Sequence, residues 1–258
     1  MKGFLLAAGN GTRLRPLTNS TPKCLVPIQG GPLLAIWLQW CAMYGIDQVL
    51  LNSHAHSDSV RQYLSAYRGP VQVTLTHEPE LLGSAGTVHM NRAFVAEEKE
   101  FVVLYADVLT SCQFEKMLDF HRLRNAPVTL GTCRVPNPRD CGIVTADETG
   151  RVVDFTEKPQ DPKADTAFSG VLIGGPVLLD QIPRRVPADI GFDVLPNLVG
   201  SMFAFPIAEY TLDIGTQEKY ERAQREWPGT RKKSIWRPSE QPRQGRTNSR
   251  LLSSRSEP

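Results

Sequence analysis

A glycine loop near the start of the chain carries two cationic side chains. The loop reads Gly9-Asn10-Gly11-Thr12-Arg13, it follows an apolar run at residues 3–8, and Lys23 comes ten positions after Arg13. Glycines at the carboxyl end of a buried strand let backbone N–H groups approach an anion, and nearby cations neutralise it. The residues therefore indicate a phosphate site, and two fixed cations suit a triphosphate better than a dinucleotide.

Two common glycine loops do not fit this sequence. The dinucleotide fingerprint requires a glycine three residues after Gly11, where this chain has Leu14. The P-loop requires Gly-Lys-Ser/Thr, and here Gly11 is followed by Thr12 and Arg13. A surface turn with solvated charges is the alternative for a bare Gly-x-Gly, but it does not account for the whole string.

Asp107 is the clearest acidic candidate. It directly follows the continuous apolar run at residues 101–106. A carboxylate at the carboxyl end of a buried parallel strand points into the ligand crevice of an open α/β sheet. We therefore expect Asp107 to lie near the glycine loop.

The first half of the chain alternates strand-like and helix-like segments. Such alternation predicts βαβ units and a parallel sheet covered on both faces. We expect a serine cap at the start of the helix over residues 57–67. The predicted strands are residues 3–8, 48–53, 71–77 and 101–106, and the predicted helices are residues 32–45, 57–67, 84–95 and 113–124.

The second half is richer in strand patterns. Residues 128–135, 142–145, 151–155 and 168–173 read as strands, with a turn at residues 147–150. The predicted fold class is thus α/β, a Rossmann-like mixed, mostly parallel sheet with helices on both faces and a β-rich insertion. After Gln224 large apolar residues become scarce, so we expect a folded domain over residues 1–226 and a basic, disordered tail over residues 227–258.

Charge and cysteine content narrow the class of protein. Residues 228–258 hold eight of the 29 Lys and Arg residues but two of the 27 Asp and Glu residues, so the net charge of +2 hides a mildly acidic folded part. The five cysteines are scattered, with no CxxC pair, which fits buried thiols in a reducing compartment. No signal-peptide core or run of 18 apolar residues is present, so we expect a cytoplasmic protein without a membrane span.

The segment from Leu6 to Thr18, together with Pro22-Lys23-Cys24-Leu25-Val26-Pro27-Ile28, strongly resembles the signature of the sugar-1-phosphate nucleotidyltransferases. That family includes mannose-1-phosphate guanylyltransferase and glucose-1-phosphate thymidylyltransferase, and the resemblance extends over residues 1–226. Two departures are Ala8, where many members have glycine, and residues 189–196, which match the family's helical segment loosely.

The resemblance implies a set of nucleotide and metal residues. Asp107 resembles the first Mg²⁺-binding aspartate, and Asp213 in Leu212-Asp213-Ile214-Gly215-Thr216 resembles the second, with a helix cap as the alternative for Asp213. Residues 78–86 resemble the base-binding loop, with a plain strand-to-helix turn as the alternative. The implied catalytic residues are Arg13, Lys23, Asp107 and Asp213, and the implied nucleotide-binding residues are Leu6, Ala8, Gly9, Gly11, Thr12, Arg13, Glu80, Gly83 and Gly86.

The resemblance also implies a sugar-phosphate site. Glu157-Lys158-Pro159 resembles the sugar motif, in which Lys158 would bind the phosphate and Glu157 a hydroxyl, and Gly142 and Gly170 match positions that lie against the sugar. The implied reaction joins a nucleoside triphosphate to a sugar 1-phosphate with Mg²⁺. GTP with a mannose- or heptose-like sugar is favoured; thymidylyl, uridylyl or cytidylyl transfer and a non-catalytic regulatory role stay open. The two substrates are the expected partners, with no nucleic acid, and a homo-oligomer stays open.

Overall fold

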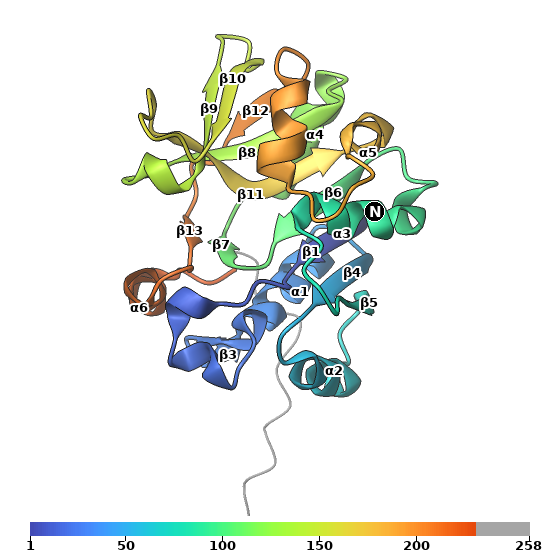
Figure 1. The fold of residues 1–258 in the computed structure, drawn as a ribbon, viewed down its shortest axis with the longest axis vertical. Helices are drawn as coiled ribbons and strands as arrows, with labels where there is room; N and C mark the ends of the chain where they lie inside the picture. The colour runs from blue at the N-terminus through green and yellow to red at the C-terminus, as the bar shows by residue number, and fades with distance from the viewer. Residues whose placement is uncertain (231–258) are drawn as a thin grey trace, which may run out of the picture.

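The computed structural model describes residues 1–230, so residues 231–258 of the tail predicted over residues 227–258 lie outside the described part. Within residues 1–230 a nine-stranded sheet has the order β10-β9-β11-β6-β1-β4-β5, with β8 and β12 joined to β11 through β8. Figure 1 shows the strands of the first half below and those of the second half above. The strands of this sheet are β1 (Lys2–Leu6), β4 (Gln48–Ser53), β5 (Gln72–His77), β6 (Phe101–Tyr105), β8 (Val128–Arg134), β9 (Gly142–Ala146), β10 (Val152–Glu157), β11 (Thr166–Gly174) and β12 (Phe203–Pro206).

The two halves of the sheet differ in strand direction. In the first half β1 pairs in parallel with β4 and β6, and β4 with β5. In the second half β11 runs antiparallel to β6, β8 and β9. The predicted mixed α/β architecture with a β-rich second part is confirmed, and the parallel pairs lie mainly where βαβ units were predicted.

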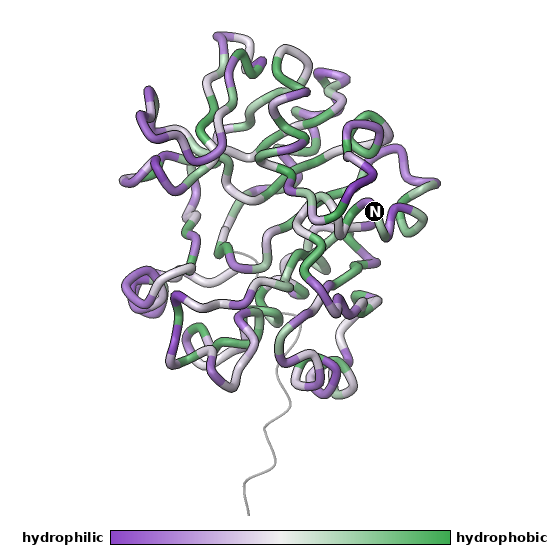
Figure 2. Tube along the Cα trace, in the orientation of Figure 1, coloured by the Kyte–Doolittle hydropathy of each residue, from purple (hydrophilic) through white to green (hydrophobic). Residues whose placement is uncertain are grey.

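Helices cover both faces of the sheet. Because successive strand residues point to opposite sides, neighbouring residues of β1 pack against different helices. Leu5 packs in one core cluster with residues of α1 (Leu33–Met43), α4 (Phe114–Leu123) and α6 (Gln217–Glu226). Its neighbour Phe4 packs in the other cluster with residues of α3 (Ser84–Met90) and α5 (Pro176–Gln181). Figure 2 shows the apolar residues gathered along the sheet, whereas α6 at the edge is largely hydrophilic.

The predicted helix over residues 57–67 starts where expected, but its predicted serine cap is wrong. Helix α2 (Ser57–Ala66) begins at Ser57, but the residue that precedes it is His56, and no side chain caps the helix. Ser57 is already helical, and its hydroxyl lies 2.9 Å from the hydroxyl of Ser53 at the end of β4. The Ser57 hydroxyl thus contacts a neighbouring strand and does not accept the capping hydrogen bond from its own helix that the sequence predicted.

The last described segment returns to the first half of the chain. Strand β13 (Thr211–Asp213) pairs antiparallel with β7 (Val108–Thr110), and α6 packs beside the loop that carries Arg13 (Figure 1). The Tyr220 hydroxyl donates a hydrogen bond to the carbonyl of Pro27 at 2.8 Å. Trp227, one residue past the predicted domain boundary, is buried and packs against Tyr210. A further two-stranded ribbon joins β2 (Pro27–Ile28) and β3 (Gly31–Pro32).

Candidate active site

A cavity of about 270 Å³ opens at the carboxyl ends of the parallel strands β1, β4 and β6. This end of an open α/β sheet is where ligands bind, because the loops there leave the sheet in different directions. We call it the central cavity. Six of the predicted site residues line it, namely Leu6, Ala8, Gly9, Lys23, Gly83 and Asp107.

The glycine loop leaves β1 directly into the wall of the central cavity. Gly11 has φ of 61°, and its carbonyl accepts hydrogen bonds from the Thr18 hydroxyl at 2.7 Å and the Leu14 N–H at 2.9 Å. A Cβ at Gly11 would lie 3.0 Å from Cγ2 of Thr18, so this turn is both left-handed and close-packed. Nothing lies within 4 Å of the Cβ position of Gly9. A phosphate has room to approach the backbone there.

A buried polar network forms the wall opposite the glycine loop. The Glu78 side chain is buried, and its Oε1 accepts hydrogen bonds from Thr87 Oγ1 at 2.6 Å and Asn52 Nδ2 at 2.8 Å. Asn52 Oδ1 in turn accepts a hydrogen bond from the N–H of Ala7 at 2.6 Å. The network therefore ties the start of the glycine loop to the loop that follows β5.

Close backbone packing fixes the loop at residues 78–86. Gly83 has φ of 77°, and a Cβ there would lie 2.2 Å from the carbonyl oxygen of Ala188. The Gly86 N–H donates a hydrogen bond to that same carbonyl at 3.1 Å. Gly86 thus contacts the segment at residues 186–188 and not the cavity, whereas Glu80 has an exposed side chain outside the cavity wall. Among residues 78–86 the buried carboxylate belongs to Glu78.

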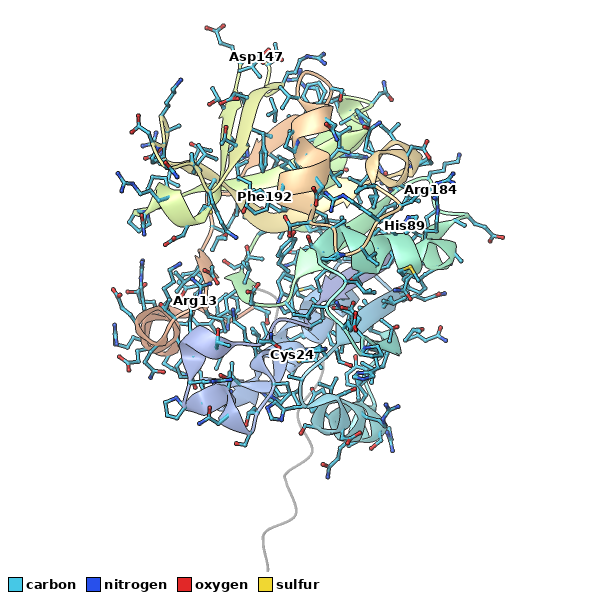
Figure 3. All side chains as sticks on the ribbon, viewed as in Figure 1. Arg13, Cys24, His89, Asp147, Arg184 and Phe192 are labelled. Carbon is cyan, nitrogen blue, oxygen red and sulfur yellow. The ribbon has the colours of Figure 1, made fainter. Side chains whose placement is uncertain are left out.

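Four charged side chains converge at one end of the central cavity, and we call them the charged cluster: Arg13, Lys23, Asp107 and Asp213. Lys23 Nζ lies 2.7 Å from Asp107 Oδ2 and 4.0 Å from Asp213 Oδ1. A Cβ at Gly215 would meet Arg13 Nη2 at 3.0 Å and Asp213 Oδ1 at 2.9 Å. Figure 3 shows Arg13 beside α6.

The β7–β13 ribbon explains how two acids so far apart in the sequence meet. Asp213 stands opposite Val108 in the ribbon, and the Ile214 N–H donates a hydrogen bond to the Asp107 carbonyl at 2.9 Å. The alternative reading of Asp213 as a helix cap is not what the structure has, because Thr216 caps α6 through a hydrogen bond from the Lys219 N–H.

The electrostatic field of the cluster keeps Asp107 charged. Burial acts to raise the pKa of this carboxyl, but Lys23 at 2.7 Å and the guanidinium of Arg13 together hold the pKa below its ordinary value. Cys24, which also lines the cavity, is different, because burial raises the pKa of its thiol to about 12. The cavity therefore offers ionised oxygen ligands and cations, but no thiolate nucleophile.

The predicted sugar residues are Gly142, Glu157, Lys158 and Gly170, which we call the Glu157 group. Gly142, Glu157 and Gly170 lie on β9, β10 and β11, and Lys158 follows β10 directly. A Cβ at Gly142 would lie 2.5 Å from Glu157 Oε2, so the carboxylate rests against the backbone of that glycine. Lys158 Nζ lies 3.8 Å from Glu157 Oε1 and 5.5 Å from the ring centre of Phe192. Burial raises the pKa of Glu157, the negative charge of Asp189 raises it further, and Lys158 opposes both.

Tyr105 links the Glu157 group to the central cavity. It lines the cavity, and a Cβ at Gly170, which has φ of 78°, would lie 3.0 Å from its Cβ. Burial raises the pKa of the Tyr105 hydroxyl, and the negative charges of Asp189 and Glu157 act in the same direction. Asp189 Oδ2 accepts a hydrogen bond from Ser84, which is also in the cavity wall. The two predicted subsites are therefore neighbours.

A family model described as nucleotidyl transferase matches residues 2–228 of this chain. The chain belongs to the nucleotidyl transferase family. Mannose-1-phosphate guanyltransferase beta-B of Xenopus laevis is 33% identical over 226 residues, which cover 85% of this chain and 62% of the relative. Mannose-1-phosphate guanylyltransferase of Mycobacterium tuberculosis is 34% identical over 223 residues, covering 84% and 62%. The chain thus spans about three fifths of the length of these relatives.

A solved structure has the same fold as this chain. HddC from Yersinia pseudotuberculosis, solved in complex with GMP-PN, superposes with a TM-score of 0.74 at 22% identity over 88% of this chain and 99% of that one. The mixed sheet with its β-rich second half is therefore an established architecture.

The acids of the charged cluster, Asp107 and Asp213, fit a divalent cation. Lys23 lies close to both Asp107 and Asp213, so one cation already faces both carboxylates. Within residues 1–230 no group of three or more His, Cys, Asp or Glu side chains is arranged so that it could hold a metal ion by itself. Mg²⁺ is commonly held by one or two carboxylates, with phosphate oxygens and water completing its shell. The donor set matches that arrangement.

Several residues of the site were not predicted from the sequence. Asn52 is the last residue but one of β4, and its place beside the glycine loop follows from the parallel pairing of β1 with β4. Lys219 lies 3.0 Å from Asp213 Oδ2, which no local pattern indicates. Glu78 stands at the end of β5, and its position after a strand was the available signal.

Proposed function

We propose that the chain transfers a nucleotidyl group from a nucleoside triphosphate to a sugar 1-phosphate, forming a nucleotide-sugar and pyrophosphate. The observation that carries this proposal is the convergence of Lys23, Asp107 and Asp213 at the end of the central cavity. The curated relatives support it, since those named above are mannose-1-phosphate guanylyltransferases.

The glycine loop and the charged cluster would hold the nucleotide. In this assignment Arg13 and the backbone of residues 9–12 bind the β- and γ-phosphates, and Lys23 lies beside the α-phosphate as negative charge grows in the transition state. Gly83 and neighbouring backbone groups, with Leu6, Ala8 and the Glu78 network behind them, form the proposed base pocket. Of the predicted residues, Gly11 and Gly86 would shape the loops, Thr12 would offer a backbone N–H, and Glu80 would lie at the rim.

Asp107 and Asp213 are the proposed ligands of Mg²⁺. When bound, this ion would neutralise phosphate charge and orient the phosphate oxygens. The low pKa of Asp107 suits the role, because the carboxylate stays ionised over the whole neutral and weakly acidic range.

The sugar 1-phosphate would enter from the side of the Glu157 group. The attacking phosphate oxygen is already anionic at neutral pH, so the reaction needs no general base, and the task of the site is to bring two anions together in line. In this proposal Glu157 accepts a hydrogen bond from a sugar hydroxyl, Lys158 binds near the phosphate, and Gly142 and Gly170 leave space for the ring.

GTP with a mannose- or heptose-like sugar 1-phosphate is the favoured substrate pair. The named relatives act on mannose 1-phosphate, and the HddC structure holds a guanine nucleotide analogue. Thymidylyl, uridylyl and cytidylyl transfer are the alternatives. A non-catalytic regulatory role is the second candidate, and the presence of Lys23, Asp107 and Asp213 argues against it.

We place the reaction in the cytoplasm. The cysteines of residues 1–230 are all free, and Cys133 and Cys141 are partly exposed, which suits a reducing compartment. No helix among residues 1–230 is long and apolar enough to cross a membrane.

A substrate panel tests the proposal. The full chain is mixed with Mg²⁺, one of GTP, dTTP, UTP, CTP or ATP, and one of several sugar 1-phosphates, and pyrophosphate release is followed. We expect the highest turnover with GTP and mannose 1-phosphate, and no release with EDTA. Absence of pyrophosphate release from every pair would support the regulatory role instead.

A further inference from the structure

Lys219 is a cation of the site that the sequence motifs do not include. It stands in the first turn of α6, and its Nζ donates a hydrogen bond to Asp213 Oδ2 at 3.0 Å. Lys23 approaches the other oxygen of the same carboxylate, at 4.0 Å from Oδ1. Asp213 is therefore bracketed by two ammonium groups, one from each side.

The position of Lys219 on its helix is unfavourable in itself. The first turn of a helix carries the positive end of the helix dipole, so an acidic residue stabilises it and a cation does not. Glu218, also in this turn, follows the rule, whereas Lys219 does not. The Asp213 contact offsets the cost, but the concentration of positive charge at this end of α6 suits an anion of more than one charge.

Lys219 lies near Cys141, the residue that precedes Gly142 of the Glu157 group. Burial raises the pKa of the Cys141 thiol, and among its charged neighbours Lys219 acts most strongly in the opposite direction, while Asp213 and Glu157 raise it. The Cys141 carbonyl accepts a hydrogen bond from the Lys158 N–H at 2.9 Å. Cys141 is thus joined to the Glu157 group through Lys158 and through its chain neighbour Gly142, whereas Lys23 lines the central cavity.

The charge balance of the cluster would allow the Lys219 ammonium to bind a substrate anion. Arg13, Lys23 and Lys219 carry three positive charges against two negative charges on Asp107 and Asp213. A divalent cation on the two carboxylates would take over their neutralisation, and the Lys219 ammonium would then lack a counter-ion. A sugar phosphate entering beside Asp213 supplies one.

We propose that Lys219 binds the phosphate of the incoming sugar 1-phosphate, as a second lysine beside Lys158. The inference rests on the proposed function. Lys158 pairs with Glu157 and lies over Phe192, while Lys219 pairs with Asp213, so the two lysines would reach the phosphate from the Glu157 side and from the Asp213 side. Figure 3 shows Phe192 above the level of Arg13, on the second-half side of the site.

The test compares Lys219→Ala, Lys219→Arg and a matched control, Arg222→Ala, in the full chain. Arg222 lies one turn further along α6 and pairs with Glu226 on the exposed side. The readouts are kcat and KM for mannose 1-phosphate and for GTP by pyrophosphate release, and Mn²⁺ binding in the presence of GTP. Thermal melting confirms that each variant folds.

We expect Lys219→Ala to raise KM for mannose 1-phosphate by about 10- to 100-fold, the range of a lost charge-assisted hydrogen bond. The KM for GTP and the Mn²⁺ affinity should change by less than about threefold, which is below the loss of one such bond. Lys219→Arg should recover most of the lost affinity, because it keeps the charge, and Arg222→Ala should match the wild type.

Two results would overturn the inference while leaving the proposed function intact. One is an unchanged KM for mannose 1-phosphate in Lys219→Ala. The other is weaker Mn²⁺ binding with no selective effect on the sugar phosphate, which would make Lys219 a positioning residue for Asp213. A wild-type chain that releases no pyrophosphate with any sugar phosphate would overturn the proposed function and this inference with it.

Discussion

In the central cavity Asn52, Glu78 and Thr87 are buried and bonded to one another, whereas the side chains of Lys158 and Lys219 are partly open to solvent. Glu78 is 2% exposed and accepts two side-chain hydrogen bonds on one oxygen. The side chain of Lys158 is 55% exposed and that of Lys219 is 34% exposed. Satisfied buried networks fix one geometry, while exposed long side chains can adjust.

The difference has a functional meaning under the proposed reaction. A base pocket selects among nucleotides that differ in a few polar atoms, and a rigid wall serves that task. The sugar 1-phosphate brings a charge of about −2 that must approach another anion. Mobile lysines can follow that charge as the phosphates come together.

Asp107 lies where the two regions meet, so its loss should affect both substrates. Asp107→Asn should lower kcat by about 100- to 1000-fold, because it removes a charge that acts on the reacting phosphates. Pyrophosphate release measures the rate, and Asp154→Asn on exposed β10 is the control. A rate within threefold of wild type would contradict the assignment.

Gly83→Ala tests whether the cavity wall is as rigid as its packing indicates. The new Cβ would lie 2.2 Å from the Ala188 carbonyl oxygen in a backbone with φ of 77°, so we expect a loss of about 2 to 4 kcal/mol in the free energy of unfolding and a raised KM for GTP. Gly200→Ala is the matched control, since Gly200 has φ of 85° and nothing within 4 Å of its Cβ position. If denaturant unfolding gives the same loss of unfolding free energy in the two variants, the backbone at Ala188 moves to make room for the new methyl group.

Thr87→Val removes one hydroxyl from the buried network with little change in shape. Glu78 would lose its partner at 2.6 Å, which should cost about 1 to 3 kcal/mol of stability and raise KM for GTP while leaving KM for the sugar phosphate unchanged. Thr132→Val is the control, because that buried hydroxyl bonds the Phe205 carbonyl on β12, away from the cavity. A rise in the sugar-phosphate KM alone would reverse the roles of the two regions.

The pH dependence should report the Glu157 group. The pKa of Glu157 is raised above its ordinary value of 4.5, so kcat/KM for the sugar phosphate should fall as the pH drops through that raised pKa and the carboxylate becomes protonated. Asp107 stays ionised over the same range because its pKa is lowered. Asp189→Asn removes a negative neighbour and should move the acid limb to lower pH by less than about one unit. If the acid limb of the kcat/KM profile moves to higher pH or does not move, it does not come from the protonation of Glu157.

Local patterns predicted the elements better than the site. The predicted strand at residues 48–53 appears with those bounds as β4. Its apolar residues are consecutive in the sequence, so a local pattern was enough to predict it. Asp107 was predicted to lie near the glycine loop, since the parallel strand ends meet at one edge of the sheet. Side-chain choices within a loop were harder, as the exposure of Glu80 and the burial of Glu78 show.

Long-range pairing is what the sequence could not provide. Asp213 lies near Asp107 only because β13 pairs with β7, although the whole β-rich half separates these strands in the sequence. Lys219 follows from the same return, and Asn52 from the register of β4 beside β1. Such contacts depend on the completed sheet and leave no periodic pattern in either segment.

The proposed function depends most on Asp107 and Asp213 binding the same metal ion beside the nucleotide. Mn²⁺ binding to the chain in the presence of GTP, followed by electron paramagnetic resonance, tests this directly in the wild type, Asp107→Asn, Asp213→Asn and the double variant. We predict that each single substitution weakens Mn²⁺ binding by at least about tenfold. The double variant should bind little worse than the weaker single variant, because one shared site is already lost. Wild-type affinity in either single variant would contradict the convergence of the two acids on one ion.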